Sequence, residues 1–166
     1  EGEVFYSDTD AKFKVGITVD AWASGGNLGT DRGFIAGAGI QTAAVGAGGY
    51  THPGNALVAN CEEYNGTAWS EVNNINSARR SAAGTGLQTA ALSIGGRGPT
   101  GPPNDVAIVE SYDGTDWTEV ADLDNARRNL AAVGTQTAAL ALGGALATGY
   151  TESWDGSSWT EVANLN

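Results

Sequence analysis

The feature that most constrains this chain is a phrase of small residues that occurs three times at nearly constant spacing. GIQTAAVGAGG stands at 39–49, GLQTAALSIGG at 86–96 and GTQTAALALGG at 134–144. The Gln-Thr pairs are 47 and 48 residues apart, and so are the glycine pairs that close each copy. Residues 65–96 and 113–144 align without a gap and share 17 identities in 32 positions. Such a period indicates an array of one repeated supersecondary unit.

The third copy separates most cleanly into four short strands. We expect them at 129–134, 137–144, 150–154 and 158–164. The last two are joined by the turn DGSS, in place of which the earlier copies have DGTD and NGTA. Asp-Gly and Asn-Gly supply the positive φ angles that tight hairpin turns require. The Ala-rich segment is short, ends in two glycines and lacks a polar face at helical spacing, which argues against a helix.

The early strands of each copy carry small residues, and the late strands carry large aromatic ones. In TAALAL (137–142), Leu140 and Leu142 point to one side and alanines to the other. Both faces are apolar, so we expect this strand to be covered on both sides. Sheets packed around an axis need this taper, and glycine pairs allow close backbone approach where they crowd. Four-stranded units of about 40 to 50 residues predict an all-β protein built as a β-propeller.

Each copy resembles the kelch motif, in which an apolar strand and a glycine pair precede an aromatic residue and, five residues later, a tryptophan. The aromatic residues are Tyr64, Tyr112 and Trp154, and the tryptophans are Trp69, Trp117 and Trp159. Kelch repeats belong to the galactose-oxidase-like propellers. The resemblance covers about 40–166 and implies an architecture, but it indicates almost nothing about activity.

A closer resemblance is to the kelch-like repeats of bacteriophage tail and fibre proteins, notably those of phages of marine bacteria. It is carried by GTQTAAL (134–140), the glycine pair after it, and ESYDGTDWTEV (110–120). The N-terminal GEVFYSDTDAKFKVGITVDAW (2–22) also resembles a short hairpin common in phage fibre chains. This resemblance implies a component of the virion, outside the cell.

The repeats predict how the chain is divided. We expect an N-terminal β-hairpin or partial blade in 1–22 and three kelch-like repeats in 23–166. The repeats lie at about 23–69, 70–117 and 118–159, followed by the start of a further one. This gives about three and a half four-stranded antiparallel blades, whereas propellers close with about 4 to 8. Because a partial ring exposes sheet edges, either these residues belong to a longer chain or several copies complete one another.

The charge balance bears on the partners of the protein. Nineteen acidic residues against 8 basic ones give a net charge of −11. The chain therefore lacks the basic surface of a nucleic-acid-binding protein, and an anionic membrane would repel it. No apolar run approaches the roughly 20 residues of a membrane-spanning helix. We expect partners among other virion or tail proteins, copies of this chain or a host surface glycan, with no nucleic acid and no membrane insertion.

No set of residues predicts catalysis. His52 is the only histidine and Cys61 the only cysteine, so the copper centre of galactose oxidase, which needs two histidines, cannot be built. We expect His52 in an exposed loop and Cys61 as a small buried thiol. Glu62 and Glu63 face opposite sides of a strand, which does not suit the paired carboxylates of a glycosidase. We predict no enzyme activity, no metal and no cofactor.

An Arg-Arg pair recurs at 79–80 and 127–128, with Arg32 in the first copy. Because these arginines keep step with the repeat, we expect them to pair with the repeated Glu71 and Glu119 or to cap loop carbonyls. The alternative is a basic ring that grips an acidic glycan, because arginine binds carboxylates bidentately.

The loops after the glycine pairs vary while the strands around them stay nearly constant. They read YTHPGNALVAN, RGPTGPPNDVA and ALATGY. Scaffolds that repeat their core and vary one set of loops usually place recognition there. The candidate ligand-binding residues are Tyr50, His52, Arg97, Asn104, Asp105 and Tyr150.

Together these features predict a non-enzymatic module of a phage tail or fibre that presents loops to a host surface glycan or protein. One alternative is a purely structural adaptor or decoration protein of the virion. Another is a carbohydrate-binding propeller that is secreted by a bacterium or held at its surface.

Overall fold

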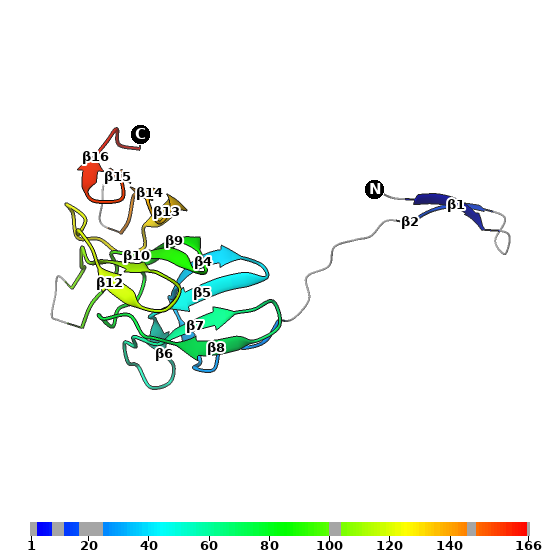
Figure 1. Ribbon diagram of the computed structural model, residues 1–166, viewed down its shortest axis with the longest axis horizontal. Coiled ribbons are helices and arrows are strands. Elements are labelled where there is room, and N and C mark those ends of the chain that lie inside the picture. Colours follow the sequence, from blue (N-terminus) through cyan, green and yellow to red (C-terminus); the bar gives the residue numbers. More distant parts are fainter. Residues whose placement is uncertain (1–2, 8–11, 17–24, 100–103, 146–148, 166) are drawn as a thin grey trace.

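The expected all-β class is confirmed. The computed structural model describes residues 3–7, 12–16, 25–99, 104–145 and 149–165, and within these ranges the chain forms strands and turns without a helix (Figure 1). Three four-stranded antiparallel sheets contain most of the described strand residues, and each is built from one continuous stretch of sequence.

Within each sheet the four strands follow one another in chain order. The first sheet consists of β4 (Ala36–Ile40), β5 (Ala43–Ala47), β7 (Cys61–Tyr64) and β8 (Trp69–Val72). The second sheet consists of β9 (Ala83–Leu87), β10 (Ala90–Ile94), β11 (Val109–Tyr112) and β12 (Trp117–Glu119). The third sheet consists of β13 (Ala131–Thr135), β14 (Ala138–Leu142), β15 (Thr151–Trp154) and β16 (Trp159–Glu161).

Two short strand pairs lie outside these sheets. β1 (Glu3–Ser7) pairs antiparallel with β2 (Lys12–Gly16), and β3 (Arg32–Gly33) pairs with β6 (Tyr50–Thr51). The remainder of 1–22, for which we expected a hairpin or partial blade, lies outside the described residues. The four-stranded sheets end two or three residues after the repeat boundaries suggested by the tryptophans, because each tryptophan begins the last strand of its sheet.

The hairpin turns between the third and fourth strands follow the expected Asp-Gly chemistry. In the second sheet, the backbone N–H groups of Thr115 and Asp116 each donate to the Asp113 carboxylate at 2.8 Å. Gly114 then takes a φ of +93°, which a residue with a Cβ rarely adopts. Asn65 and Asp155 accept equivalent bonds in the other two sheets, so the same local signal closes all three hairpins.

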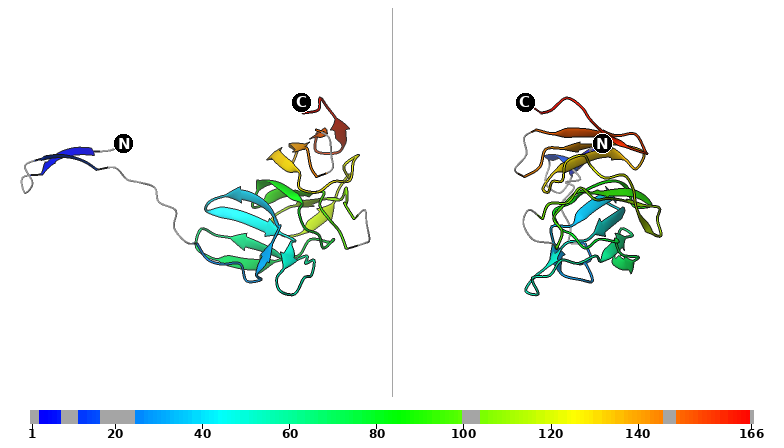
Figure 2. Two further views of the ribbon diagram at one scale, coloured as in Figure 1. Left: turned by 180° about the vertical axis from the view of Figure 1, so that it is seen from behind. Right: turned by 90° about the vertical axis from the view of Figure 1, so that its left-hand side faces the viewer.

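The three sheets stack in series, each with its front face on the back face of the sheet before it (Figure 2). The front face is the side that carries Tyr64, Tyr112 or Trp154, and the back face is the opposite side, which carries Val45, Leu92 or Leu140. The first core joins the back of the first sheet to the front of the second through Val45, Ala47, Cys61, Ala91, Tyr112 and Trp117. The second core joins the back of the second sheet to the front of the third through Leu92, Ile94, Val109, Ala139, Trp154 and Trp159. The aromatic residues of the second and third copies, Tyr112, Trp117, Trp154 and Trp159, are therefore core residues.

The first strands of the sheets, β4, β9 and β13, lie side by side where the stack is narrowest (Figure 1). A Cβ on Gly84 of β9 would come within 2.4 Å of the Gly37 carbonyl oxygen of β4. On the other side of β9, the Thr85 hydroxyl donates to the Gly134 carbonyl of β13 at 2.8 Å. Small residues recur in these strands because backbones of neighbouring sheets touch there.

The glycine pairs allow the close approach expected of them. Gly95 and Gly96 have φ angles of +63° and +114°, and a Cβ on Gly95 would lie 2.6 Å from the Arg127 carbonyl oxygen. Gly96 N–H donates to that same carbonyl at 2.9 Å. The pair thus lets the end of β10 bond to the segment that leads into the next sheet.

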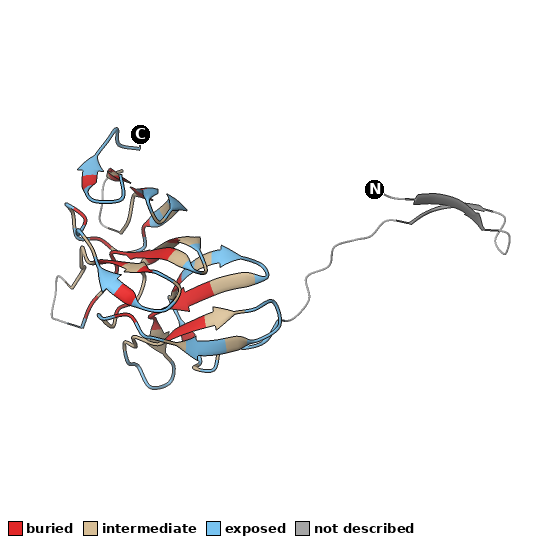
Figure 3. Ribbon diagram, viewed as in Figure 1, coloured by how far each residue is buried: buried red, intermediate tan, exposed pale blue. Residues whose placement is uncertain are grey.

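One expectation fails in the third sheet. β14 was expected to be covered on both sides, but Leu140 is 36% exposed, and Val133 beside it on β13 is 52% exposed (Figure 3). The equivalent Leu92 in the second sheet is only 1% exposed, because the third sheet covers it. No described sheet follows the third one, so its back face meets solvent.

The front-to-back packing predicts the effect of shortening one leucine. Leu92→Ala removes a side chain enclosed between two sheets and should lower the free energy of unfolding by about 2–5 kcal/mol, as measured by urea denaturation. Leu87→Ala is the matched control, because Leu87 lies in the same sheet but is 58% exposed. Equal losses in the two variants would contradict this packing.

Candidate functional site

The loops that follow the glycine pairs are held against the segments that lead into the next sheet. Gly49 N–H donates to the Arg79 carbonyl at 2.9 Å. Arg80 and Arg97 exchange two backbone hydrogen bonds, at 3.1 and 2.7 Å. This pairing brings the loop after β5, the entry to the second sheet and the loop after β10 to one place.

A pocket of about 160 Å³ lies where these three segments meet. Its walls are formed by Tyr50, Leu57, Arg80, Arg97, Gly98, Pro99 and Asn104. The Arg80 guanidinium carbon lies 4.3 Å from the centroid of the Tyr50 ring and 5.7 Å from that of Phe34. Arg97 is oriented by its Nε, which donates to Asn104 Oδ1 at 2.7 Å. A second hollow, of about 380 Å³, shares Gly98 and Pro99 with this pocket.

The structure brings most of the candidate ligand-binding residues together, although in different roles. Tyr50, Arg97 and Asn104 line the pocket. His52 is exposed, as expected, and its ring lies edge-on to Tyr50 with centroids 5.2 Å apart. Asp105 forms an ion pair with Arg128 and so faces the entry to the third sheet. Tyr150 is half-buried and is not among the residues that line this pocket.

The sequence reasoning missed Arg80, which lines the pocket, and Phe34, whose ring lies next to Arg80. Arg80 was grouped with Arg79 as a structural residue, although only the first arginine of the pair turns inward. Phe34 lies at φ +59° in the turn before β4 and is 59% exposed, which is unusual for a phenylalanine. The arginine doublet itself could have indicated the role of Arg80. Two adjacent residues in an extended segment point in opposite directions, so if Arg79 is buried, Arg80 faces outward.

The chemistry of the pocket suits a ligand with a negative charge and a ring. Among the described residues, neither the Arg80 guanidinium nor the terminal nitrogens of Arg97 donate a hydrogen bond within the chain. Guanidinium groups bind carboxylates with paired hydrogen bonds, and aromatic side chains next to them offer an apolar surface. Arg80 and Arg97 make the pocket locally basic, although the net charge of the chain is −11.

The expected pairing of Arg79 and Arg127 with Glu71 and Glu119 is wrong. The structure pairs Arg32 with Glu62, Arg79 with Glu110 and Arg127 with Glu152, one buried ion pair in each sheet. Glu71 and Glu119 pair across the strands with Glu62 and Glu110, but on the last strand of each sheet they are exposed. The other expected role, capping of loop carbonyls, is confirmed at Ser77, to whose carbonyl Arg79 donates, and Arg79 also donates to the Ser93 carbonyl within β10.

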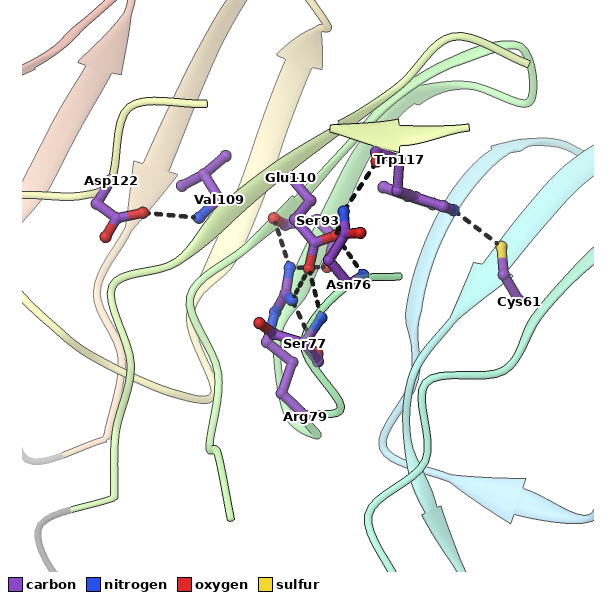
Figure 4. A network of polar contacts seen from close by, with 9 residues as sticks. All are labelled: Cys61, Asn76, Ser77, Arg79, Ser93, Val109, Glu110, Trp117 and Asp122. Atoms are coloured by element: carbon purple, nitrogen blue, oxygen red, sulfur yellow. Dashed lines mark hydrogen bonds and ion pairs between the residues drawn. The ribbon is translucent and has the colours of Figure 1, made fainter. Parts of the chain in front are cut away.

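Each buried glutamate also accepts backbone N–H groups from the segment that carries its arginine. Glu110 accepts from the N–H groups of Asn76 and Ser77 at 2.7 and 3.2 Å, and the Asn76 side chain bridges to the Trp117 carbonyl at 2.8 Å (Figure 4). These bonds tie the connecting segment to the third strand of its sheet. A sequence signal for them existed, because Glu62, Glu110 and Glu152 each stand two residues before the repeated aromatic residue.

Cys61 is buried on the back of the first sheet, as expected, where Trp117 Nε1 donates to its sulfur at 3.4 Å (Figure 4). Burial raises the pKa of the Cys61 thiol to about 11, against the smaller opposing effect of this hydrogen bond. The thiol therefore stays protonated and enclosed at neutral pH, which removes its nucleophilic form.

Within the described part of the chain, no three histidine, cysteine or acidic side chains are grouped so that they could hold a metal ion. In the same part of the chain, no helix has the length and apolar character needed to span a membrane. No protein-family model matches this chain, and no curated protein matches it.

The buried ion pair of the first sheet predicts a dependence of stability on pH. Burial alone raises the pKa of Glu62, but bonds from the Gly29 N–H, Arg32 and the Thr30 N–H outweigh it and hold that pKa below its usual 4.5. A lowered folded-state pKa contributes stability that is present above about pH 4.5 and is lost as the pH falls through the folded value.

Glu62→Gln should therefore lower the urea midpoint at pH 7, and its stability should fall less between pH 7 and acid than that of the parent chain. Removing one partner of a buried ion pair typically costs about 3–5 kcal/mol. Glu119→Gln, at an exposed site, serves as the control and should keep the parent pH profile. A Glu62→Gln profile parallel to that of the parent would contradict the ion pair.

The enclosed thiol predicts slow modification. Cys61 should not react with a water-soluble disulfide reagent in the folded protein at pH 8, and it should react stoichiometrically in urea. Ser70→Cys provides an exposed thiol in the same sheet as a positive control. Equal reaction rates of the two thiols in the folded protein would show that the first core is open.

Proposed function

We propose that this chain is a non-enzymatic recognition module, a kelch-like β-propeller segment of a phage tail or fibre that binds a host surface ligand through its variable loops. The observation that carries this proposal is the pocket between the first and second sheets. In it Arg80 and Arg97, whose terminal guanidinium nitrogens donate no hydrogen bond among the described residues, line the walls together with Tyr50, and Tyr50 and Arg97 belong to loops that differ from copy to copy.

The serial stack supports the propeller part of the proposal. Propeller blades are four-stranded antiparallel sheets whose first strands line a central axis and whose last strands lie at the rim. Here β4, β9 and β13 lie side by side, small residues fill the space between them, and aromatic residues fill the wider layers beyond. A stack of three such sheets fits a segment of a propeller ring.

An acidic saccharide is the ligand class that the pocket favours. A carboxylate on a sugar could accept paired hydrogen bonds from Arg97 or Arg80, and the Tyr50 and Phe34 rings next to Arg80 provide apolar surface for a sugar ring. Binding rather than turnover is further supported by the state of the only cysteine, which is enclosed and protonated.

The setting of the module is proposed from the resemblance of its repeat to phage tail and fibre chains, which places it on the virion. Two other settings remain as alternatives. A structural adaptor or decoration role is favoured by the open sheet faces at the two ends of the stack, which suit packing against other proteins. A secreted or surface-held bacterial propeller would use the same pocket for carbohydrate binding.

Binding can be tested with an array of acidic and neutral host surface glycans. The parent chain should bind acidic glycans saturably, and Arg97→Gln and Arg80→Gln should each weaken binding by about tenfold or more, because a hydrogen bond to a charged group contributes about 1.5–3 kcal/mol. Tyr150→Ala is the control, since Tyr150 lies outside the pocket, and it should bind as the parent does.

Absence of saturable binding to any glycan would remove the recognition role and favour the structural adaptor. Binding that is lost in Tyr150→Ala but kept in Arg97→Gln would show that the glycan binds at the loop after β14 and not at this pocket.

A further inference from the structure

The two ends of the stack carry the same faces that meet inside it. On the back of the third sheet, Val133 is 52% exposed, whereas Thr85 at the same position of the second sheet is 7% exposed. Leu140 repeats the position of Leu92, which the next sheet buries completely. The third sheet thus has a back face built for a neighbour that the described chain does not supply.

The front of the first sheet has the complementary character. Ala44, Tyr64 and Trp69 repeat the positions of residues that are buried in the other two sheets, yet all three are only half-buried. The rings of Tyr64 and Trp69 are tilted toward each other with centroids 5.2 Å apart, as those of Trp154 and Trp159 are in the third sheet. The aromatic front face is therefore in place, and no sheet of the described part of the chain packs in front of it.

In the second and third sheets, a glutamine in the turn between the first and second strands forms hydrogen bonds to the preceding sheet. Gln88 Nε2 donates to the carbonyls of Tyr64 and Ala44 at 2.8 and 3.1 Å. Gln136 Nε2 donates in the same way to the Tyr112 carbonyl and to the Ser111 hydroxyl.

Gln41 occupies the same place in the first sheet, but among the described residues no four-stranded sheet precedes it. Its side chain is exposed, and within the described residues it forms no hydrogen bond.

The third sheet offers the acceptor for such a glutamine. A hollow of about 320 Å³ opens on it and is lined by Val133, Gly134, Ala138, Ala139, Leu140, Ser153 and Trp154. Ser153 and Trp154 repeat the positions of Ser111 and Tyr112, the two acceptors of Gln136. An amide placed in this hollow would meet a hydroxyl and a carbonyl as it does one sheet earlier.

We propose that a second copy of this chain docks head to tail, with the front of its first sheet on the back of the third sheet. A dissimilar protein would have to reproduce a glutamine, a small residue and an aromatic pair at the repeat spacing, and this chain already carries all of them. The contact continues the two interfaces inside the stack. Formed reciprocally, it joins two copies into a closed ring of six four-stranded sheets, within the range of about 4 to 8 for propellers. It does not depend on any ligand.

The test is the mass of the purified chain under native conditions, by light scattering and native mass spectrometry. The expected result is a discrete species of twice the 16.8 kDa chain mass. Leu140→Glu should return it to a single chain by placing a charge on the back face, and Gln41→Glu should do so by replacing the amide donor with an acceptor. Both residues are exposed in the single chain, so the urea transition of each variant should show an intact fold.

Leu87→Glu is the matched control, because Leu87 is also an exposed leucine but lies in the second sheet, away from both terminal faces. A parent chain that stays single at its highest soluble concentration would overturn the proposal. An association that Leu87→Glu disrupts as strongly as Leu140→Glu would also overturn it. So would a pair that survives Gln41→Glu, because it would use only the back face and would not be head to tail.

Discussion

The buried arginine–glutamate pair is the interaction on which each sheet depends. The arginine comes from the segment that enters a sheet and the glutamate from the third strand of the same sheet, so the pair ties the two ends of one repeat together. Taking both charges out of water is costly, and the cost is offset only because the glutamate also accepts backbone N–H groups and the arginine caps carbonyls. The pair specifies how the connecting segment lies more than it adds net stability.

This constraint also determines where the pocket lies. Because Arg79 is drawn inward to Glu110, its neighbour Arg80 is directed outward, over the Tyr50 ring. The same division occurs at Arg127 and Arg128, where the outer arginine meets Asp105 instead. The buried ion pair of each repeat therefore directs a second arginine, Arg80 or Arg128, toward the surface at successive sheet junctions. The neighbouring variable loop determines whether that arginine forms an ion pair, as Arg128 does with Asp105, or is available to a ligand.

Much of the fold could be predicted from the sequence because its signals are local and repeated. The Asp-Gly turn at 113–114 and the glycine pair at 95–96 both act through φ angles that the residues themselves determine. The partner of Arg79 could not be predicted in this way. Glu71, Glu110 and Glu119 are all glutamates in strands, and only the stacking of sheets decides that Glu110 is enclosed while the other two face water. Similarly, Leu92 and Leu140 stand in nearly identical phrases and differ in burial only because one has a sheet behind it.

The proposed head-to-tail ring bears on the strength of recognition. At the junction between the third sheet and a second copy, the places of Arg97 and Arg80 are taken by Tyr50 and Gly33 of the second copy, which carry no charge. Each copy therefore contributes one pocket with two arginines, and a ring of two copies presents two. A surface that displays many copies of an acidic sugar could then engage both pockets, which raises the apparent affinity without any new contact. Because the loops differ along the chain, each copy has one such pocket, and the pairing of two copies would make a weak single site bivalent.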